Sequence, residues 1–138
     1  MEISLAVVSD FAGLDSAGKL NILGIFHEIN PPGLPTIVPQ FFLVVVYAFE
    51  PTELDTQFQG TIEFVNPILD RTLVWQGSIG ISAERVQRRG RPGTVSQVTA
   101  LAGIPFEREG TYQFVITVEG DNGRDWRRAV PLFVNSPA

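Results

Sequence analysis

The chain has 138 residues, of which 44% are hydrophobic and 18% are charged, so it holds enough apolar material for the core of one ordinary domain. It contains no cysteine and a single histidine, His27, which excludes a disulfide scaffold, a thiolate metal site and any site built from several histidines. The net charge of −5 argues against general binding to nucleic acid or to an anionic membrane.

The first residues have the alternation of a β-strand and lack a targeting signal. Ile3, Leu5 and Val7 alternate with polar or smaller residues, and Phe11 extends the face that they share. An acid in the second position argues against a signal peptide. The longest apolar run, residues 41–49, is too short to cross a bilayer as a helix. We therefore expect a soluble, cytoplasmic protein.

Strands and turns continue along the first half of the chain. After a turn at 15–18, residues 20–29 are apolar enough for a second strand. Four prolines between 31 and 39 are incompatible with a helix or a central strand, so this segment is expected to be a stiff crossover loop. Residues 41–49 are β-branched and aromatic, and they predict a strand without polar alternation.

The apolar strand at 41–49 requires cover on both of its faces. In a two-sheet fold one face of a strand packs on the other sheet, so the outer side chains of Phe42, Val44 and Val46 need a separate partner. That partner is either the proline-rich segment 31–39 of the same chain or another protein chain, and the sequence leaves both open. These three residues are candidates for protein contact.

The second half of the chain is interpreted as further strands. Trp75 is expected to share a buried face with Leu73 and Ile79, and Phe64 to be buried on the preceding strand. Asn122-Gly123 predicts a hairpin with a type I′ turn. Residues 84–93 are the one stretch of low hydrophobicity and are expected to be an exposed loop. The expected strands are 57–64, 73–81, 94–101, 112–118 and 125–134.

Taken together, these segments give eight strands and no helix. Short strands at regular spacing, separated by turn signals, are typical of a sandwich or barrel. The balance of one-sided and two-sided strands favours two packed sheets. We therefore expect an all-β fold, an eight-stranded antiparallel β-sandwich of the Ig-like or jelly-roll type, forming a single domain over residues 1–138.

Three parts of the chain resemble a known family. They are Gly18–Phe26, the proline-rich crossover with the long apolar strand after it, and Pro105-Phe106 through Gly110-Thr111-Tyr112 with the final hairpin. Together they resemble a family of short, uncharacterised bacterial proteins, each a single Ig-like β-sandwich domain. The resemblance covers most of the chain and implies the fold but no activity. The arginine-rich stretch 84–93 has no counterpart in the family's pattern.

The Gly-x-Tyr element at 110–112 is also similar to one in Ig-like and fibronectin-like modules. In those modules a tyrosine at the start of a late strand ties down a nearby loop through its hydroxyl. Tyr112 has either this role or that of a half-buried core tyrosine, whose hydroxyl needs a partner in any case.

No set of residues predicts catalysis. His27 lies in an apolar strand, and the adjacent Glu28 points to the opposite face, so it is poorly placed to orient the imidazole. The sequence has neither a Gly-x-Ser-x-Gly elbow nor a phosphate-binding loop. We therefore predict that the protein is not an enzyme and has no cofactor.

Two groups of carboxylates are candidates for Ca²⁺ binding. Glu50, Glu53 and Asp55 follow the long strand, while Asp121 and Asp125 lie at the last hairpin. Loops rich in carboxylates can supply the six to eight oxygen ligands of Ca²⁺. Neither group has the spacing of an EF-hand, and turn chemistry already accounts for Asp121. We predict no metal site.

The charges are divided unevenly along the chain. Residues 1–70 hold nine acids and one base, a net charge of −8, whereas residues 71–138 hold nine arginines and six acids, a net charge of +3. Four arginines lie close together at 85–91, and aromatic residues for stacking on bases are missing beside them. This group is either a solvated loop or a docking site for an acidic partner: Arg85, Arg88, Arg89 and Arg91.

These observations favour a non-enzymatic module that acts by protein–protein contact. The partner is expected to be another copy of the chain or another protein, since acidic and basic regions on one chain can pair between copies. A ligand- or Ca²⁺-binding module and an enzyme with an unrecognised carboxylate site are the alternatives.

Overall fold

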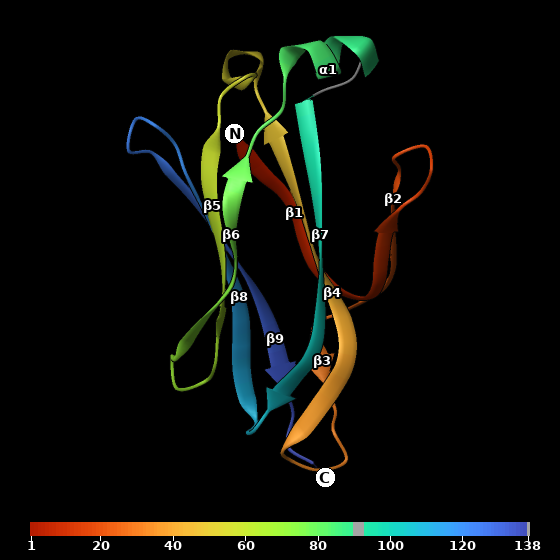
Figure 1. Ribbon diagram of the computed structural model, residues 1–138. Helices are drawn as coiled ribbons and strands as arrows, with labels where there is room; N and C mark the ends of the chain where they lie inside the picture. Colours follow the sequence, from red (N-terminus) through yellow and green to blue (C-terminus); the bar gives the residue numbers. More distant parts are fainter. Residues whose placement is uncertain (90–92, 138) are drawn as a thin grey trace.

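The computed structural model describes residues 1–89 and 93–137, with residues 88 and 89 described by their backbone alone (Figure 1). Nine strands account for most of the described residues, together with one 3-10 helix at Pro51–Glu53 and one α-helix, α1. The elements are β1 (Glu2–Leu14), β2 (Leu20–Phe26), β3 (Glu28–Ile29), β4 (Thr36–Phe49), β5 (Phe58–Val65), β6 (Arg71–Ile79), α1 (Ala83–Arg89), β7 (Gly93–Phe106), β8 (Gly110–Glu119) and β9 (Asp125–Val134).

The strands form two sheets that lie face to face (Figure 1). The four-stranded sheet has the order β2-β1-β4-β7, and the five-stranded sheet has the order β3-β9-β8-β5-β6. Every neighbouring pair is antiparallel except β3 and β9, which run parallel. The expectation of an all-β fold is thus confirmed, with two sheets as its architecture.

The described chain has nine strands rather than the expected eight, because the segment 20–29 changes sheets at His27. Its first part, β2, pairs with β1 in the four-stranded sheet. Its last two residues, β3, pair with β9 in the other sheet. The carbonyl oxygen of His27 accepts a hydrogen bond of 2.9 Å from the amide of Phe133, which attaches the crossing point to β9.

The inner faces of the two sheets share one hydrophobic core, and β4 lies at its centre. From Phe41 onward, every second residue of β4 points inward, and each of these residues is at most 6% exposed: Phe41, Leu43, Val45, Tyr47 and Phe49. From the opposite sheet, the ring of Phe114 meets that of Phe41 edge to face, with the ring centroids 6.2 Å apart. Since each large apolar side chain contributes roughly 1.5–3 kcal/mol on burial, the long apolar strand is a main source of stability.

The proline-rich loop is shorter than the expected segment 31–39. Pro31 is buried and Leu34 packs against the core, but β4 already begins at Thr36 and includes Pro39. This first part of β4 pairs with β7 alone, because the pairing with β1 starts only at Phe42. A proline is tolerated there since one side of the strand needs no hydrogen-bond donor.

The stretch 84–93, expected to be an exposed loop, begins with a short helix instead. Ser82 precedes α1, and its Oγ accepts a hydrogen bond of 3.2 Å from the amide of Arg85. A serine in this position satisfies one of the free amides of the first turn, so it is a helix start signal in the sequence. At seven residues, α1 is too short to show as a helical stripe. No helix among the described residues is long and apolar enough to span a membrane.

A bulge changes the expected register of β6. Ile62 of β5 pairs with Trp75, but the next residue, Glu63, pairs with Leu73, so one residue of β6 is left over. Trp75 therefore faces inward and is half-buried, whereas Leu73 lies on the outer face and is 57% exposed. The expectation that the two share a face was wrong. Phe64 is on the inner face as expected, but it too is only half-buried.

The last hairpin forms where it was expected, with a different turn. Gly120 and Arg124 close the loop by a hydrogen bond of 2.9 Å, and Gly123 has a φ of 75°. Asn122 does not have the positive φ that a type I′ turn requires, and its Oδ1 accepts a hydrogen bond from the amide of Arg124. The connection is a three-residue loop that ends in a left-handed glycine.

Candidate functional site

The outer faces of the two sheets differ sharply in polarity. On the five-stranded sheet, the residues that alternate with the core positions are mainly polar, and Arg71 forms an ion pair of 3.3 Å with Glu63 there. Its central strands present Gln59, Thr61, Glu63, Thr117 and Glu119, while Leu73 on β6 and Phe133 on β9 are its exposed large apolar residues. This face has the character of an ordinary solvated surface.

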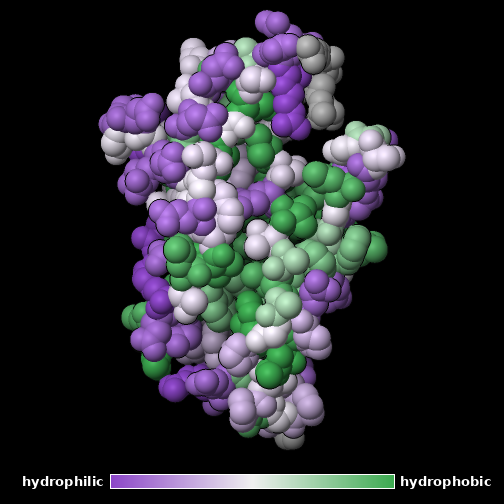
Figure 2. Space-filling model, viewed as in Figure 1, coloured by the Kyte–Doolittle hydropathy of each residue, from purple (hydrophilic) through white to green (hydrophobic). Residues whose placement is uncertain are grey.

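The outer face of the four-stranded sheet is apolar. In the register of β1, β2 and β4, one set of side chains lies side by side on this face, and we call it the apolar face: Phe11, Leu23, Ile25, Phe42, Val44 and Val46. Three of them are large and strongly exposed, Phe11 at 50%, Leu23 at 65% and Ile25 at 59%. Figure 2 shows hydrophobic side chains gathered below the tip of the β1–β2 hairpin. Such a patch on a folded domain is typical of an interaction surface.

The three β4 residues singled out from the sequence all lie on the apolar face. Val44 is fully buried, and its neighbours in register are Val7 of β1 and Val98 of β7. Phe42 and Val46 are half-buried, and the Phe42 ring meets the ring of Phe11 edge to face with centroids 5.6 Å apart. The proline-rich segment lies at the end of the sheets where β4 begins, away from the middle of the strand (Figure 1).

A bulge in β1, which the sequence did not predict, places Phe11 on the apolar face. The register between β1 and β4 shifts between Ile3 and Leu5. Ile3 is therefore in the core, while Leu5 and the residues that alternate with it, including Phe11, point outward. The expectation that Ile3, Leu5, Val7 and Phe11 share one face was wrong. The exposed Leu23 and Ile25 were also missed, although an apolar pattern on both faces of 20–29 was the available signal.

The predicted arginine cluster does not lie on the apolar face. Arg85 is exposed on α1, which stands at the end of the molecule where β7 begins (Figure 1). Arg88 and Arg89 belong to the last turn of the same helix, and Arg91 lies outside the described residues. The apolar face and the arginine cluster are thus separate features of the surface.

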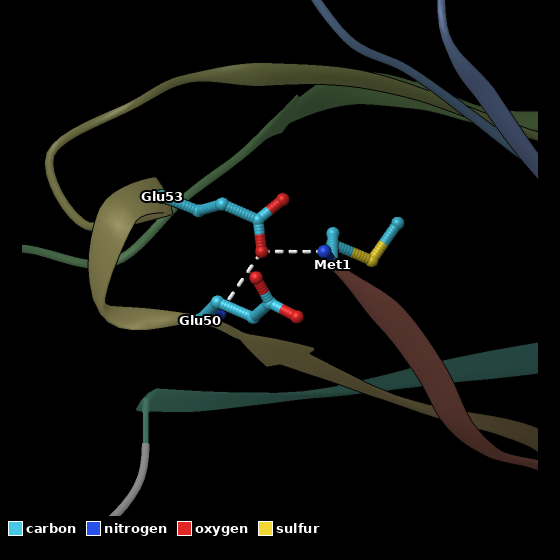
Figure 3. A network of polar contacts seen from close by, with 3 residues as sticks. All are labelled: Met1, Glu50 and Glu53. Carbon is cyan, nitrogen blue, oxygen red and sulfur yellow. Dashed lines mark hydrogen bonds and ion pairs between the residues drawn. The ribbon is translucent and has the colours of Figure 1, made fainter.

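The carboxylates after β4 serve the local structure (Figure 3). One oxygen of Glu53 accepts hydrogen bonds from the Met1 ammonium group and from the amide of Glu50, the latter at 2.9 Å. Desolvation works against ionisation of Glu53, but these hydrogen bonds and the nearby positive charges outweigh it, so the pKa of this carboxyl is lowered. Asp55, in a left-handed conformation with φ of 66°, accepts a hydrogen bond from the amide of Ala83 at 3.0 Å.

The other polar candidates are dispersed over the surface. The side chain of His27 is exposed at the point where the chain changes sheets, and Asp121 and Asp125 are exposed at the last hairpin. Within residues 1–89 and 93–137, no three histidine, aspartate or glutamate side chains come close enough together to hold a metal ion.

A cavity of about 620 Å³ opens between the edge strands β6 and β7. Apolar side chains from both sheets line it, among them Phe64, Val74, Leu101 and Ile104. Its polar rim includes Asp70, Glu107 and Arg108. Tyr112 also lines the cavity, and its hydroxyl donates to the carbonyl oxygen of Arg108 at 2.8 Å, so the tyrosine ties down the turn before its own strand.

Residues 4–134 match the family of unknown function DUF6941, and the chain belongs to this family. The match extends over nearly the whole chain, which confirms the expectation of an uncharacterised family. No curated protein and no solved structure matches the chain.

Proposed function

We propose that this member of the DUF6941 family is a non-enzymatic β-sandwich module of the Ig-like or jelly-roll type that acts by protein–protein contact, with a second copy of the chain as its first partner. The observation that carries the proposal is the apolar face. Its exposed Phe11, Leu23 and Ile25 contrast with the polar outer face of the other sheet.

Contact through the apolar face has a clear physical basis. Burial of apolar surface contributes roughly 25 cal/mol per Å². A partner that covers Phe11, Leu23 and Ile25, each of which is at least 50% exposed, therefore gains several kcal/mol before the costs of association are subtracted. Phe11 and Phe42 already support each other edge to face, and Val44 fills the space beside them. These contacts hold the side chains of the apolar face in place, so fewer of them need to be ordered when a partner binds.

The chain itself is a suitable partner for charge reasons. Its first 70 residues carry a net charge of −8 and the remainder +3, and strands of both parts are interleaved in the two sheets, so every copy carries charges of both signs. Contacts that pair opposite charges between copies add electrostatic attraction to apolar burial. A partner of strongly basic or acidic character throughout would repel one part of this chain.

The test is the solution mass of the protein over a wide concentration range, measured by sedimentation or light scattering. We expect a reversible dimer or larger assembly, and we expect the double variant Leu23→Ser with Ile25→Thr to weaken it. The matched control is Leu73→Ser, because Leu73 has nearly the same exposure, 57%, on the outer face of the other sheet. Association that is insensitive to the double variant, or equally sensitive to the control, would contradict a role for the apolar face.

The cavity between β6 and β7 favours ligand binding as a second candidate function. Its volume of about 620 Å³ is within the usual range for small-molecule sites, and apolar and polar side chains contribute to its walls in similar measure. A small aromatic probe such as indole would bind there if the site is open to ligands. Shifts in the NMR signals of Leu101 and Ile104 on titration would support this function, and shifts confined to other residues would contradict it.

A further inference from the structure

The edge strand β7 has few of the common protections against pairing. It is 14 residues long and contains no charged side chain. Natural edge strands are commonly shortened, charged, bulged or covered, because their free amides and carbonyls can pair with another chain. Within the described chain, β7 has β4 on one side and no strand on the other. The only interruptions are Gly103, with a φ of 68°, and Pro105, both near its end.

The other sheet edges differ from β7. At the far side of the four-stranded sheet, β2 is seven residues long and is interrupted by Gly24 with a φ of 69°. In the five-stranded sheet, β3 has two residues, and β6 begins with Arg71. Residues 94–102 of β7 thus form the longest uncharged and regular edge among the described strands.

The edge strand is also joined to the rest of the fold along its whole length. β7 is in register with β4 along its whole length. Inside the fold, the hydroxyl of Tyr47 donates a hydrogen bond of 2.6 Å to Oε1 of Gln97. Burial raises the pKa of Tyr47 far above its usual range, which keeps this donor protonated.

Charged residues lie at both ends of β7. The helix α1, just before β7, contains one acid and three arginines in its sequence, a net charge of +2, and the acids Glu50 and Asp55 lie at the same end of the strand. The turn after β7 and the cavity rim beside it hold the acids Asp70, Glu107 and Glu109 with the single base Arg108, a net charge of −2. If two such strands pair antiparallel, helix α1 of each copy, with its three arginines, lies at the end where the other copy has Glu107 and Glu109, with an uncharged strand between.

We propose that β7 pairs antiparallel with β7 of a second copy of this chain, joining the two four-stranded sheets into one continuous sheet. Full overlap of the regular segment 94–102 places Val98 opposite its own copy and Ser96 opposite Ala100 of the partner. Both Ser96 and Ala100 lie on the outer face of β7, with Val98 between them. This pairing rests on the proposed function, because it requires self-association. It assigns the contact to the edge of β7, however, and not to the apolar face.

Charged pairs across the new ladder test the register directly. The variant Ser96→Lys with Ala100→Lys places like charges opposite each other at two sites, and we expect it to weaken dimerisation about tenfold. The variant Ser96→Lys with Ala100→Glu places opposite charges there, and we expect it to restore the wild-type affinity. As a control, Gln76→Lys with Ser78→Lys adds the same charge to the exposed edge strand β6 and is expected to leave dimerisation unchanged.

A covalent probe gives an independent readout, because the chain has no native cysteine. Directly opposed residues of antiparallel strands have Cα atoms about 4.5–5.5 Å apart, which is within the range of a disulfide. We therefore expect Val98→Cys to form a covalent dimer on mild oxidation and Ser78→Cys, on β6, to remain monomeric. Amide exchange in β7 that slows with rising protein concentration would agree with this result.

The outcomes separate this proposal from the proposed function. If the apolar-face variant abolishes association while Val98→Cys does not cross-link and the two lysine–lysine variants behave alike, the edge pairing is wrong and the proposed function stands. If the β7 variants alone weaken association, the edge pairing stands and the apolar face is not the contact. A chain that stays monomeric at millimolar concentration overturns both.

Discussion

The hydroxyl of Tyr112 donates a hydrogen bond of 2.8 Å to the carbonyl oxygen of Arg108, four residues earlier in the chain. The tyrosine ring is 3% exposed and stacks on Phe64, with the ring centroids 5.6 Å apart. One side chain therefore joins the turn between β7 and β8 to the aromatic part of the core. Of the two roles that the sequence left open for Tyr112, the structure shows the one that ties down a loop.

Removal of this hydroxyl should loosen the turn without disturbing the core. We expect Tyr112→Phe to lower the free energy of unfolding by about 1–2 kcal/mol, because the carbonyl of Arg108 loses its partner while the ring stays in place. Chemical denaturation measures this loss, with the exposed neighbour Thr111→Val as the control. A Tyr112→Phe protein as stable as the wild type would show that water replaces the hydrogen bond at no cost.

Trp75 depends on glycines for its place between the sheets. A Cβ atom at Gly77 would lie 2.7 Å from Cζ2 of the indole, and one at Gly60 would lie 3.0 Å from Cζ3. We expect Gly77→Ala to cost about 1–3 kcal/mol of unfolding free energy through overpacking. Gly33→Ala is the control, since a Cβ there has no neighbour within 4 Å.

The fluorescence of Trp75 supplies a second measurement of the same change, in a Trp126→Phe background. If the alanine at position 77 displaces the indole, its emission should shift to longer wavelength as water reaches the ring. An unchanged emission together with unchanged stability would mean that β6 moves freely enough to absorb the extra methyl group.

The ion pair at the start of the chain makes stability depend on pH. Because the pKa of Glu53 is lowered in the folded protein, the folded state binds this proton less readily than the unfolded state. Its contribution is therefore complete above the ordinary carboxyl pKa of about 4.3 and is lost as the pH falls through the lowered folded value.

We expect Glu53→Gln to be about 1 kcal/mol less stable than the wild type at pH 6.5, with the difference shrinking to near zero at about pH 2. Denaturation curves at several pH values check this, and Glu119→Gln, an exposed carboxylate on the polar sheet, controls for the loss of one negative charge. A difference that stays constant from pH 6.5 to 2 would contradict the assigned role of the carboxylate.

Much of the fold could be predicted from the alternation of residues. The apolar run 41–49 predicted a strand with two covered faces, and the structure places its core face at the centre of the molecule and Phe42, Val44 and Val46 on the apolar face. The pattern worked here because a strand with apolar residues on both faces has few other interpretations.

Bulges and sheet changes were not predictable from the same pattern. Between Ile3 and Leu5 a single register shift places Phe11 on the outer face, opposite to the face of Ile3, since a one-residue slip reverses every later side chain. At His27 the chain leaves one sheet for the other without a glycine or proline to mark the point. In both cases the cause is pairing with distant strands, which leaves no local signal.

Salt provides the last test, because it separates the two sources of association that we propose. If the acidic and basic ends of two copies meet, sodium chloride should weaken self-association, as the screening length falls from about 10 Å at 0.1 M to about 3 Å at 1 M. Ammonium sulfate, which is excluded from protein surfaces, should instead strengthen the part of the association that depends on apolar burial.

Replacing Arg88 and Arg89 with Glu should weaken association at low salt and have little effect at 1 M sodium chloride. The control is Arg127→Glu, on the outer face of the other sheet, which should leave association unchanged at both salt concentrations. Sedimentation at these salts measures the dissociation constants. Association that strengthens in sodium chloride and ignores the arginine change would show that paired charges do not contribute to the contact, because only a charge-dependent interface loses affinity when its charges are screened.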